Sequence, residues 1–382
     1  MITNDDFCTA LRGHGFDFVA GVPCSYFSGP IDRLTRDGGY LAAANEGAAL
    51  AAAAGAVAAG RRAAVIAQNS GLGNLVNPLT SLTSTYRIPV LVFMSLRGWP
   101  DPTQDEPQHA VMGTSTHALL DAVGVPHVTV PAEETSLLPA LEQAEKHLAE
   151  GRSFFVLTQK GAIEGHRGEP AAPGGAPSRI EVLRAVEPLL ARAAVVSTTG
   201  YTSRELFGVT SSRDHFYMQG SMGHAAAFGL GAALHTDGPV LVLDGDGAAI
   251  MHLGTLSTIG ASAPANLVHL VFDNGMFEST GGQATTSHAT DFAAVARAAG
   301  YASGVKCRST REVYEALERA LAGHGPHLVV AEVSGGGASG FARATGAMTT
   351  GQIRDGFARR LSTGRPAGAD ERTGPAEAEG GR

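Results

Sequence analysis

The stretch from Gly245 to Gly275, GDGAAIMHLGTLSTIGASAPANLVHLVFDNG, decides the fold. It follows the apolar run PVLVLD and contains a second one, LVHLVF, so it predicts a strand, a helix and a second, parallel strand. Asp246 and Asn274 each come at the carboxyl end of one of these strands. In a right-handed unit of this kind both side chains emerge at the same edge of the sheet, where ligands bind. We therefore expect the two residues to converge on one ion.

The residue types at this edge favour magnesium and phosphate. An Asp carboxylate, an Asn amide oxygen and a nearby backbone carbonyl form an all-oxygen set that suits Mg²⁺, which keeps positions for phosphate oxygens and water. The glycines on either side of Asp246, Gly245 and Gly247, allow backbone amides to approach an anion closely. GDG alone is also a common turn at a strand end, but Asn274 at the matching position of the next strand favours a diphosphate bridged by Mg²⁺.

Outward from this stretch, the second half of the chain alternates apolar runs with helical patterns. This alternation predicts an α/β domain built on a parallel sheet. The strands are expected at 193–197, 239–247, 266–274 and 327–333, and the helices at 180–190, from 222, at 251–261, at 291–299 and at 310–322.

The first half shows the same alternation. Its strands are expected at 17–22, 62–68, 89–95, 126–130 and 153–157. Most of these runs are apolar throughout, which indicates burial on both faces and helices on each side of a parallel sheet. We therefore predict two α/β domains of similar element order, at 1–160 and 180–362, joined by a Gly-, Pro- and Ala-rich linker at 161–179 and followed by a disordered tail at 363–382.

The composition excludes several classes of protein. The 382 residues carry 28 Lys and Arg against 36 Asp and Glu, a net charge of −8 without any basic run, so binding to nucleic acid has little support. Cys8, Cys24 and Cys307 lie far apart, which indicates neither a zinc site nor a disulfide framework and fits a reducing cytoplasm. The first residues lack a signal-peptide pattern. Leu41–Gly60 is Ala-rich with a central Glu46, which predicts a buried helix rather than a membrane span.

GDG followed, after one strand, helix and strand, by Asn resembles the diphosphate and Mg²⁺ signature of thiamine diphosphate (ThDP) enzymes. The resemblance implies that ThDP and Mg²⁺ are the cofactors, with Asp246, Asn274 and the carbonyl group of Met276 as the metal ligands. Such enzymes have a pyrimidine-binding domain and a diphosphate-binding domain. The two predicted domains match them in that order.

GSMGHAAAFGLGAAL, beginning at Gly220, is similar to the segment that packs under the cofactor in that family. The similarity implies cofactor contacts by Gly220, Ser221, Met222 and Gly223, with Met222 as the apolar residue that holds ThDP bent. The alternative is that Met222 only fills a gap in the core.

The resemblance also implies which residue supplies the acid that ThDP catalysis needs, namely Glu46. It lies in AANEGAALAAAAG, which resembles the family segment that places a Glu beside N1′ of the aminopyrimidine, where protonation favours the tautomer that takes the proton from C2. A Glu in the first turn of a helix is also an ordinary partner of the helix dipole. Glu46 in one half and Asp246 in the other fit the two-domain family, whose sites lie between subunits, so a homodimer or larger homo-oligomer is implied.

The chain has no room for a middle domain, and its short motifs resemble the phosphonopyruvate decarboxylases up to about residue 290. The motifs are GVPCSYFSGPIDRL, AANEG, QNSGLGNLVNPLTSL, DEPQHAVMG, STTGYTSRELF, QGSMGHA, LDGDGA and FESTGGQATT. Cys24 departs from the usual Asp of GVPDS, and the Gly-rich VSGGGASGFARATG replaces a more basic segment that contains proline. The second departure bears on the identity of the substrate.

The resemblance implies decarboxylation of 3-phosphonopyruvate to phosphonoacetaldehyde and CO₂, as in the biosynthesis of phosphonate antibiotics. Three alternatives remain open: a sulfopyruvate decarboxylase, a carboligase or decarboxylase of another 2-keto acid, and a non-catalytic subunit with a ThDP fold. Glu46 and Asp246 in one chain argue against the last of these.

An anionic substrate on an acidic protein needs cations gathered locally. Arg97, Lys160 and Arg204 each follow a predicted strand and are the candidates, although each alone could be a solvated surface charge. His109, in DEPQH, is the candidate for proton transfer or for binding the reacting adduct, since imidazole titrates near neutrality. Further candidates for substrate contact are Asn69, Ser70, Asn74 and His224.

Overall fold

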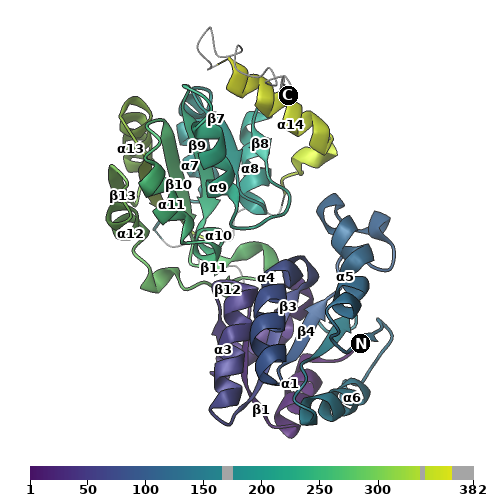
Figure 1. Cartoon of the computed structure of the whole chain (residues 1–382). Helices are drawn as coiled ribbons and strands as arrows, with labels where there is room; N and C mark the ends of the chain where they lie inside the picture. The colour runs from purple at the N-terminus through teal and green to yellow at the C-terminus, as the bar shows by residue number, and fades with distance from the viewer. Residues whose placement is uncertain (166–174, 336–339, 364–382) are drawn as a thin grey trace, which may run out of the picture.

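The computed structural model describes residues 1–165, 175–335 and 340–363. Over these residues the chain forms two parallel sheets, each of six strands, and one small antiparallel pair (Figure 1). The α/β class predicted from the sequence is confirmed in both halves.

The first sheet has the strand order β2-β1-β3-β4-β6-β5. Its central strands are apolar and almost entirely buried, as continuous apolar runs require. The strands are β1 (Phe16–Gly21), β2 (Tyr40–Ala42), β3 (Arg62–Gln68), β4 (Leu91–Ser95), β5 (His127–Val130) and β6 (Phe154–Thr158). The helices of this half are α1 (Asn4–Gly13), α2 (Ser28–Arg36), α3 (Glu46–Ala58), α4 (Leu72–Pro78), α5 (Ala110–Ala122) and α6 (Leu138–Ala149).

The second sheet has the order β13-β14-β10-β9-β7-β8. Its strands are β7 (Ala194–Ser197), β8 (Phe216–Tyr217), β9 (Val240–Gly245), β10 (Leu267–Asp273), β13 (Ser303–Cys307) and β14 (His327–Glu332), and the antiparallel pair is β11 (Met276–Phe277) with β12 (Gln283–Ala284). The helices are α7 (Arg179–Leu190), α8 (Tyr201–Thr210), α9 (Ala225–Ala233), α10 (Asp246–Met251), α11 (Thr255–Ser262), α12 (Phe292–Ala298), α13 (Thr310–Ala322) and α14 (Thr350–Ser362).

The two sheets share one topology. When β7, β8, β9, β10, β13 and β14 are counted as the first to sixth strands of their half, both sheets run second, first, third, fourth, sixth, fifth. The strand order reverses between the first and third strands of each sheet, and ligands of open α/β sheets bind beyond the carboxyl ends of the strands at such a point. Each half therefore offers one crevice of the same construction.

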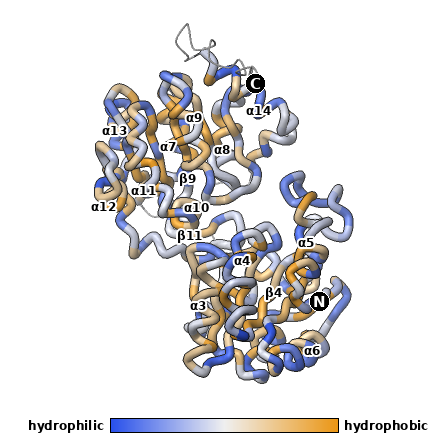
Figure 2. Tube along the Cα trace, in the orientation of Figure 1, coloured by the Kyte–Doolittle hydropathy of each residue, from blue (hydrophilic) through white to orange (hydrophobic). Residues whose placement is uncertain are grey.

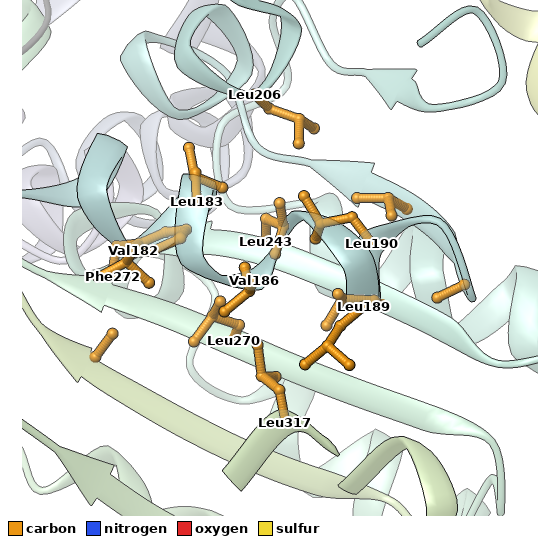
Figure 3. Close-up of a cluster of buried hydrophobic side chains, with 14 of the residues drawn as sticks. Val182, Leu183, Val186, Leu189, Leu190, Leu206, Leu243, Leu270, Phe272 and Leu317 are labelled. Atoms are coloured by element: carbon orange, nitrogen blue, oxygen red, sulfur yellow. The ribbon is translucent and has the colours of Figure 1, made fainter. Parts of the chain in front are cut away.

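Apolar side chains fill both faces of each sheet. Figure 2 shows hydrophobic stretches along the strands and their covering helices, with hydrophilic stretches on the outer loops. On one face of the second sheet, side chains of α7 such as Val186 pack against Leu270 of β10, and Leu317 of α13 joins them (Figure 3). This packing fixes the strands whose ends carry the site.

Three local predictions need correction. The helix expected from Met222 begins at Ala225, because Ser221 and Gly223 adopt positive φ angles of 53° and 84°. The helix expected at 251–261 is two helices, α10 and α11. The strand β13 was missed because it is a half-exposed edge strand without a continuous apolar run.

Parts of the predicted linker and tail, at 166–174 and 364–382, lie outside the described residues. The domain limits therefore remain predictions. The predicted buried helix within Leu41–Gly60 is α3, and across the described residues no helix is both long and apolar enough to cross a bilayer.

Candidate active site

Glu46 begins α3, and its side chain is held by Asn74 of α4. The helix starts there because the side chain of Asn45 accepts a hydrogen bond from the amide of Ala48 at 2.9 Å. The Glu46 carboxylate is 5% exposed and accepts a hydrogen bond from Asn74 Nδ2 at 2.7 Å. A Cβ atom at Gly71 would overlap this carboxylate, so only glycine leaves room for it. The acid is thus buried in a fixed position.

Glu46 and Met222 line the same cavity, which has a volume of about 520 Å³ and lies between the two halves. The halves also touch directly, since Asn45 Nδ2 donates a hydrogen bond to the carbonyl oxygen of Met251 at 3.3 Å. Residues of both halves therefore meet within a single chain, and the expectation of sites shared between subunits stays a prediction. The other predicted residues that line this cavity are Ser70, Asn74, Arg97, His109, Arg204, Gly220, Ser221 and His224.

A smaller cavity of about 70 Å³ adjoins the first and shares Met222 with it. Asp246, Asn274 and Met276 line it, as do Gly245 and Gly247. The prediction that Asp246 and Asn274 converge at one sheet edge is thus matched by their positions.

The hydrogen bonds around the smaller cavity fix its oxygen atoms. Asp246 is 3% exposed, and its Oδ2 accepts a hydrogen bond from the Thr285 hydroxyl group at 2.5 Å. Asn274 Oδ1 accepts from the amide of Met276 at 3.1 Å, and Asn274 Nδ2 donates to Glu278 at 3.4 Å. Burial and the nearby charge of Asp273 raise the pKa of Asp246 to about 6. A cation at this point would relieve the cost of ionising Asp246.

The donor set of the smaller cavity fits Mg²⁺ and a diphosphate. Within the described ranges, no group of three or more His, Cys, Asp or Glu side chains could hold a metal. A metal here would need oxygens of mixed origin, and Mg²⁺ accepts such a set when phosphate completes it. The amino end of α8, at Gly200 and Tyr201, lines the same cavity and favours an anion there.

An ion pair in the first half holds the candidate base. Asp105 accepts hydrogen bonds from Arg97 Nε and Nη2, both at 2.8 Å, and from the Gly98 amide at 2.9 Å. His109 Nδ1 lies 2.9 Å from Asp105 Oδ1. Although burial opposes its ionisation, the hydrogen bonds from Arg97 and His109 keep the pKa of Asp105 well below its usual range. The carboxylate is then a pure acceptor, so His109 Nδ1 is the donor and Nε2 is left with its lone pair.

Burial lowers the pKa of His109, which keeps the imidazole neutral near pH 7. The ring is therefore oriented by Asp105 and available as a proton acceptor at Nε2.

Two predicted substrate contacts need correction. Asn69 is fully buried and does not line the cavity: its Nδ2 donates to the Arg97 carbonyl oxygen at 2.9 Å, and its Oδ1 accepts from the Arg97 amide at 3.1 Å. It fixes the backbone of Arg97 instead. Lys160 is exposed after β6 and lines neither cavity. Since β6 lies beyond β4 in the strand order, its end is distant from the point where that order reverses.

Sequence reasoning missed residues that line the cavity. Arg343 forms an ion pair with Glu106, and both side chains line the cavity. Glu106 belongs to the quoted motif DEPQH, but Arg343 lies in the Gly-rich segment, where no strand end marked it. Residues 336–339 of that segment lie outside the described residues. Cys24 is fully buried with its Sγ 3.0 Å from Ser95 Oγ, behind the cavity wall.

Comparison with known proteins agrees with this geometry. The model of the thiamine pyrophosphate enzyme N-terminal TPP binding domain matches residues 1–117, and that of the C-terminal TPP binding domain matches residues 198–331. A phosphonopyruvate decarboxylase of Streptomyces viridochromogenes is 43% identical over 363 residues, covering 90% of this chain and 91% of that protein. The chain belongs to the phosphonopyruvate decarboxylase family of thiamine pyrophosphate enzymes.

Other relatives place the chain within this group. A phosphonopyruvate decarboxylase of Streptomyces hygroscopicus is 43% identical and covers 86% of this chain and 87% of its own length. A sulfopyruvate decarboxylase of Methanosarcina acetivorans is 26% identical, with coverage of 81% and 85%. The family relationship agrees with two TPP-binding domains and no middle domain.

Proposed function

We propose that this protein catalyses the non-oxidative decarboxylation of 3-phosphonopyruvate to phosphonoacetaldehyde and CO₂, with ThDP and Mg²⁺ as cofactors. The observation that carries the proposal is the joining of two cavities, one lined by Glu46 and Met222 and the other by Asp246, Asn274 and Met276. The 43% identity to two phosphonopyruvate decarboxylases supports the substrate. A role in phosphonate antibiotic biosynthesis follows from the same relationship.

Bound ThDP would supply an electron sink for the pair of electrons left when CO₂ departs. Asp246, Asn274 and the carbonyl oxygen of Met276 would hold Mg²⁺, and Gly245 and Gly247 would turn backbone amides toward the diphosphate. Gly220, Ser221 and Met222 line the cavity and would support the middle of the cofactor, whereas the predicted contact Gly223 lines neither cavity.

Glu46 would hold a proton at N1′ of the aminopyrimidine. Its burial and the single hydrogen bond from Asn74 fix the carboxyl group while leaving its second oxygen for the ring. Because Gly71 lacks a side chain, the carboxyl group has room to face the cavity.

The reaction breaks one carbon–carbon bond and puts a proton in place of CO₂. The proton would come from solvent by way of His109: Nε2 would first take it up on its lone pair and then pass it to the carbon that loses CO₂, since Asp105 already occupies Nδ1. Arg97 and Arg204 line the cavity and would bind anionic groups of the substrate, while Ser70, Asn74 and His224 offer polar contacts.

Sulfopyruvate is the second candidate substrate, because a sulfopyruvate decarboxylase is 26% identical over most of the chain. Carboligation would use the same site and would leave a product with a new carbon–carbon bond. A non-catalytic subunit is disfavoured, because Glu46 and Asp246 belong to one chain whose two halves meet.

We propose a cytoplasmic homodimer. The dimer is supported by the resemblance to thiamine diphosphate enzymes, whose sites lie between subunits. Cys8, Cys24 and Cys307 are all free and buried, as suits a reducing compartment. Mixing inactive Glu46→Ala with inactive Asp246→Ala protein under subunit exchange tests whether sites are shared. Regained activity means shared sites, whereas heterodimers without activity mean that each chain builds its own.

The function is tested by incubating the protein with ThDP, Mg²⁺ and phosphonopyruvate, and measuring CO₂ and aldehyde. Sulfopyruvate and pyruvate are assayed alongside. We expect kcat/KM to be highest for phosphonopyruvate and activity to disappear with EDTA. Higher kcat/KM for sulfopyruvate, or turnover without ThDP, would contradict the proposal.

A further inference from the structure

Three arginines line the larger cavity, and they differ in what neutralises them. They are Arg97, Arg204 and Arg343. Arg97 is neutralised by the two-pronged contact with Asp105, and its remaining Nη1 lies 3.5 Å from Ser25 Oγ. The Asp105 carboxylate therefore already offsets most of the charge that Arg97 could offer a substrate.

Arg204 and Arg343 are the more available cations. Within the described part of the chain, Arg204 forms no ion pair, and its guanidinium lies 5.3 Å from the centre of the Tyr201 ring. Arg343 is paired only with Glu106, among the same residues. A carboxylate that itself lines the cavity is a partner that an incoming anion can replace.

Arg343 is brought to the cavity by a segment anchored on the second half. The next residue, Ala344, is buried, and Thr345 Oγ1 donates a hydrogen bond to Gln219 Oε1 at 3.4 Å. Glu106 belongs to the first half, beside Asp105. The ion pair therefore connects the two halves. The side chain of Arg343 is 34% exposed and that of Glu106 is 23% exposed.

The surroundings of Arg343 favour a strongly charged anion. Burial and the nearby charge of Arg97 lower the pKa of Arg343, while the Asp105 carboxylate acts in the opposite direction. Glu106 brings a single negative charge to this region. A phosphonate group that has lost both protons brings more charge and three oxygens, two of which can meet the guanidinium fork at once.

We propose that Arg343 binds the phosphonate group of the substrate and that Glu106 occupies the same guanidinium when substrate is absent. This inference rests on the proposed function, and it names the residue that recognises the distal anion. It also provides a basis for selectivity. A sulfonate carries one charge, like Glu106, and gains less from the exchange than a doubly charged phosphonate. A keto acid without a distal anion gains nothing.

The test uses the enzyme loaded with ThDP and Mg²⁺ and two probes without a ketone, 3-phosphonopropionate and 3-sulfopropionate, titrated by calorimetry. Arg343→Gln should weaken 3-phosphonopropionate binding by about 10- to 100-fold, the loss expected for a charge-assisted contact. Arg343→Lys should recover part of the affinity. Glu106→Gln should strengthen binding by about 2- to 5-fold, because the competing carboxylate is gone. The opposite signs distinguish anion exchange from a purely structural role of the pair.

Arg354→Gln is the matched control, because Arg354 is exposed on α14 and pairs with the adjacent Asp355. It should bind both probes as the wild type does. Thermal unfolding and ThDP retention identify variants that fail to fold. If Arg343→Gln does not fold, the affinity of Arg343→Lys for 3-phosphonopropionate is compared with that of the wild type instead. Wild-type affinity for 3-phosphonopropionate in folded Arg343→Gln protein, or weaker binding in folded Glu106→Gln protein, would overturn the inference. Arg343-dependent binding of 3-phosphonopropionate without turnover of phosphonopyruvate would support the inference and contradict the proposed function.

Discussion

The two halves of the molecule have the same strand order but bring different chemistry to the same positions. The connection after the second strand carries Glu46 in the first half and Met222 in the second. The connection after the third strand is the Asn69–Gly71 turn in one and Asp246 in the other. The fold therefore supplies equivalent positions at the sheet edge, and residue type alone decides whether a position carries an acid, an apolar support or a metal ligand.

The halves also differ in the charges around their site residues. In the first half, charged side chains of the site are paired with one another, as in the Arg97–Asp105–His109 arrangement. In the second half, oxygen atoms of Asp246 and Asn274 surround a cavity that would gain its counter-charge from an ion. The first half is organised without a cofactor, whereas the second is suited to one. Replacements in each half test this division.

Replacing Glu46 should have the largest effect on turnover. Glu46→Gln keeps the shape of the side chain but cannot deliver a proton, so kcat should fall by about 10²- to 10⁴-fold, with only a few-fold change in ThDP affinity. Steady-state kinetics and hydrogen–deuterium exchange at C2 of bound ThDP measure the two consequences. Asn74→Ala removes the hydrogen bond to Glu46 but keeps the acid, so its kcat should fall by a smaller factor. A wild-type exchange rate in Glu46→Gln would remove Glu46 from the role of activating acid.

Replacing Asp246 should instead act on binding. Asp246→Asn removes the one carboxylate of the proposed Mg²⁺ ligands and should weaken Mg²⁺-dependent ThDP binding by at least about 100-fold. Mutation of residues that only hydrogen-bond to a metal ligand already lowers metal affinity by about 10- to 100-fold. Titration of EDTA-treated protein with ThDP and Mg²⁺ measures this. Asp237→Asn, at an exposed position of the same half, is the control. Unchanged affinity in Asp246→Asn would place the metal elsewhere.

Lowering the pH should weaken cofactor binding in the second half only. The pKa of Asp246 is raised by burial from 3.8 to about 6, so below pH 6 a cation must displace a proton. Between pH 7 and pH 5 the affinity for Mg²⁺ and ThDP should fall about tenfold. The same shift destabilises the unloaded protein as pH rises from about 4 to about 6, because ionisation of the buried group is unfavourable there. A pH-independent affinity between pH 5 and 7 would contradict this assignment.

The smallest effect is expected at Asn69. Asn69→Ala removes its hydrogen bonds to the backbone of Arg97 and should lower the free energy of unfolding by about 1–3 kcal/mol, with a modest rise in KM. Urea denaturation and kinetics measure the two quantities. Asn77→Ala, at an exposed position on α4, removes only the hydrogen bond that its side chain accepts from the Ser81 hydroxyl group and should cost less. If Asn69→Ala lost kcat while keeping its stability, Asn69 would instead act on the reaction itself.

The sequence predicted those parts of the fold in which one physical signal dominates. Continuous apolar runs located β3, β4, β9 and β10 to within about two residues, because these strands are buried on both faces. The edge strand β13 is half-exposed and carries no such signal. The start of α9 was misplaced because positive φ angles at Ser221 and Gly223 form a turn that apolar periodicity does not reveal.

A site residue could be predicted where it lies at the end of a strand. It was harder to predict where tertiary contacts determine whether the side chain lines the cavity. Asp246 and Asn274 follow from strand ends alone. Asn69 was misjudged because its position in a loop suggested exposure, whereas it turns inward to hold Arg97. Arg343 reaches the cavity through a long Gly-rich segment, and no local pattern shows where such a segment leads.

The residues that line the cavity come from opposite ends of the described sequence, so the ribosome synthesises them at different times. Glu46 emerges early, and the first half can fold around it before the ligands of the smaller cavity exist. Arg343 emerges last among the residues that line the cavity. A nascent chain would thus carry the acid without Asp246, and then Asp246 without Arg343. On the roles proposed above, an unfinished chain would hold the residues for the cofactor before it holds the residue that binds the phosphonate of the substrate.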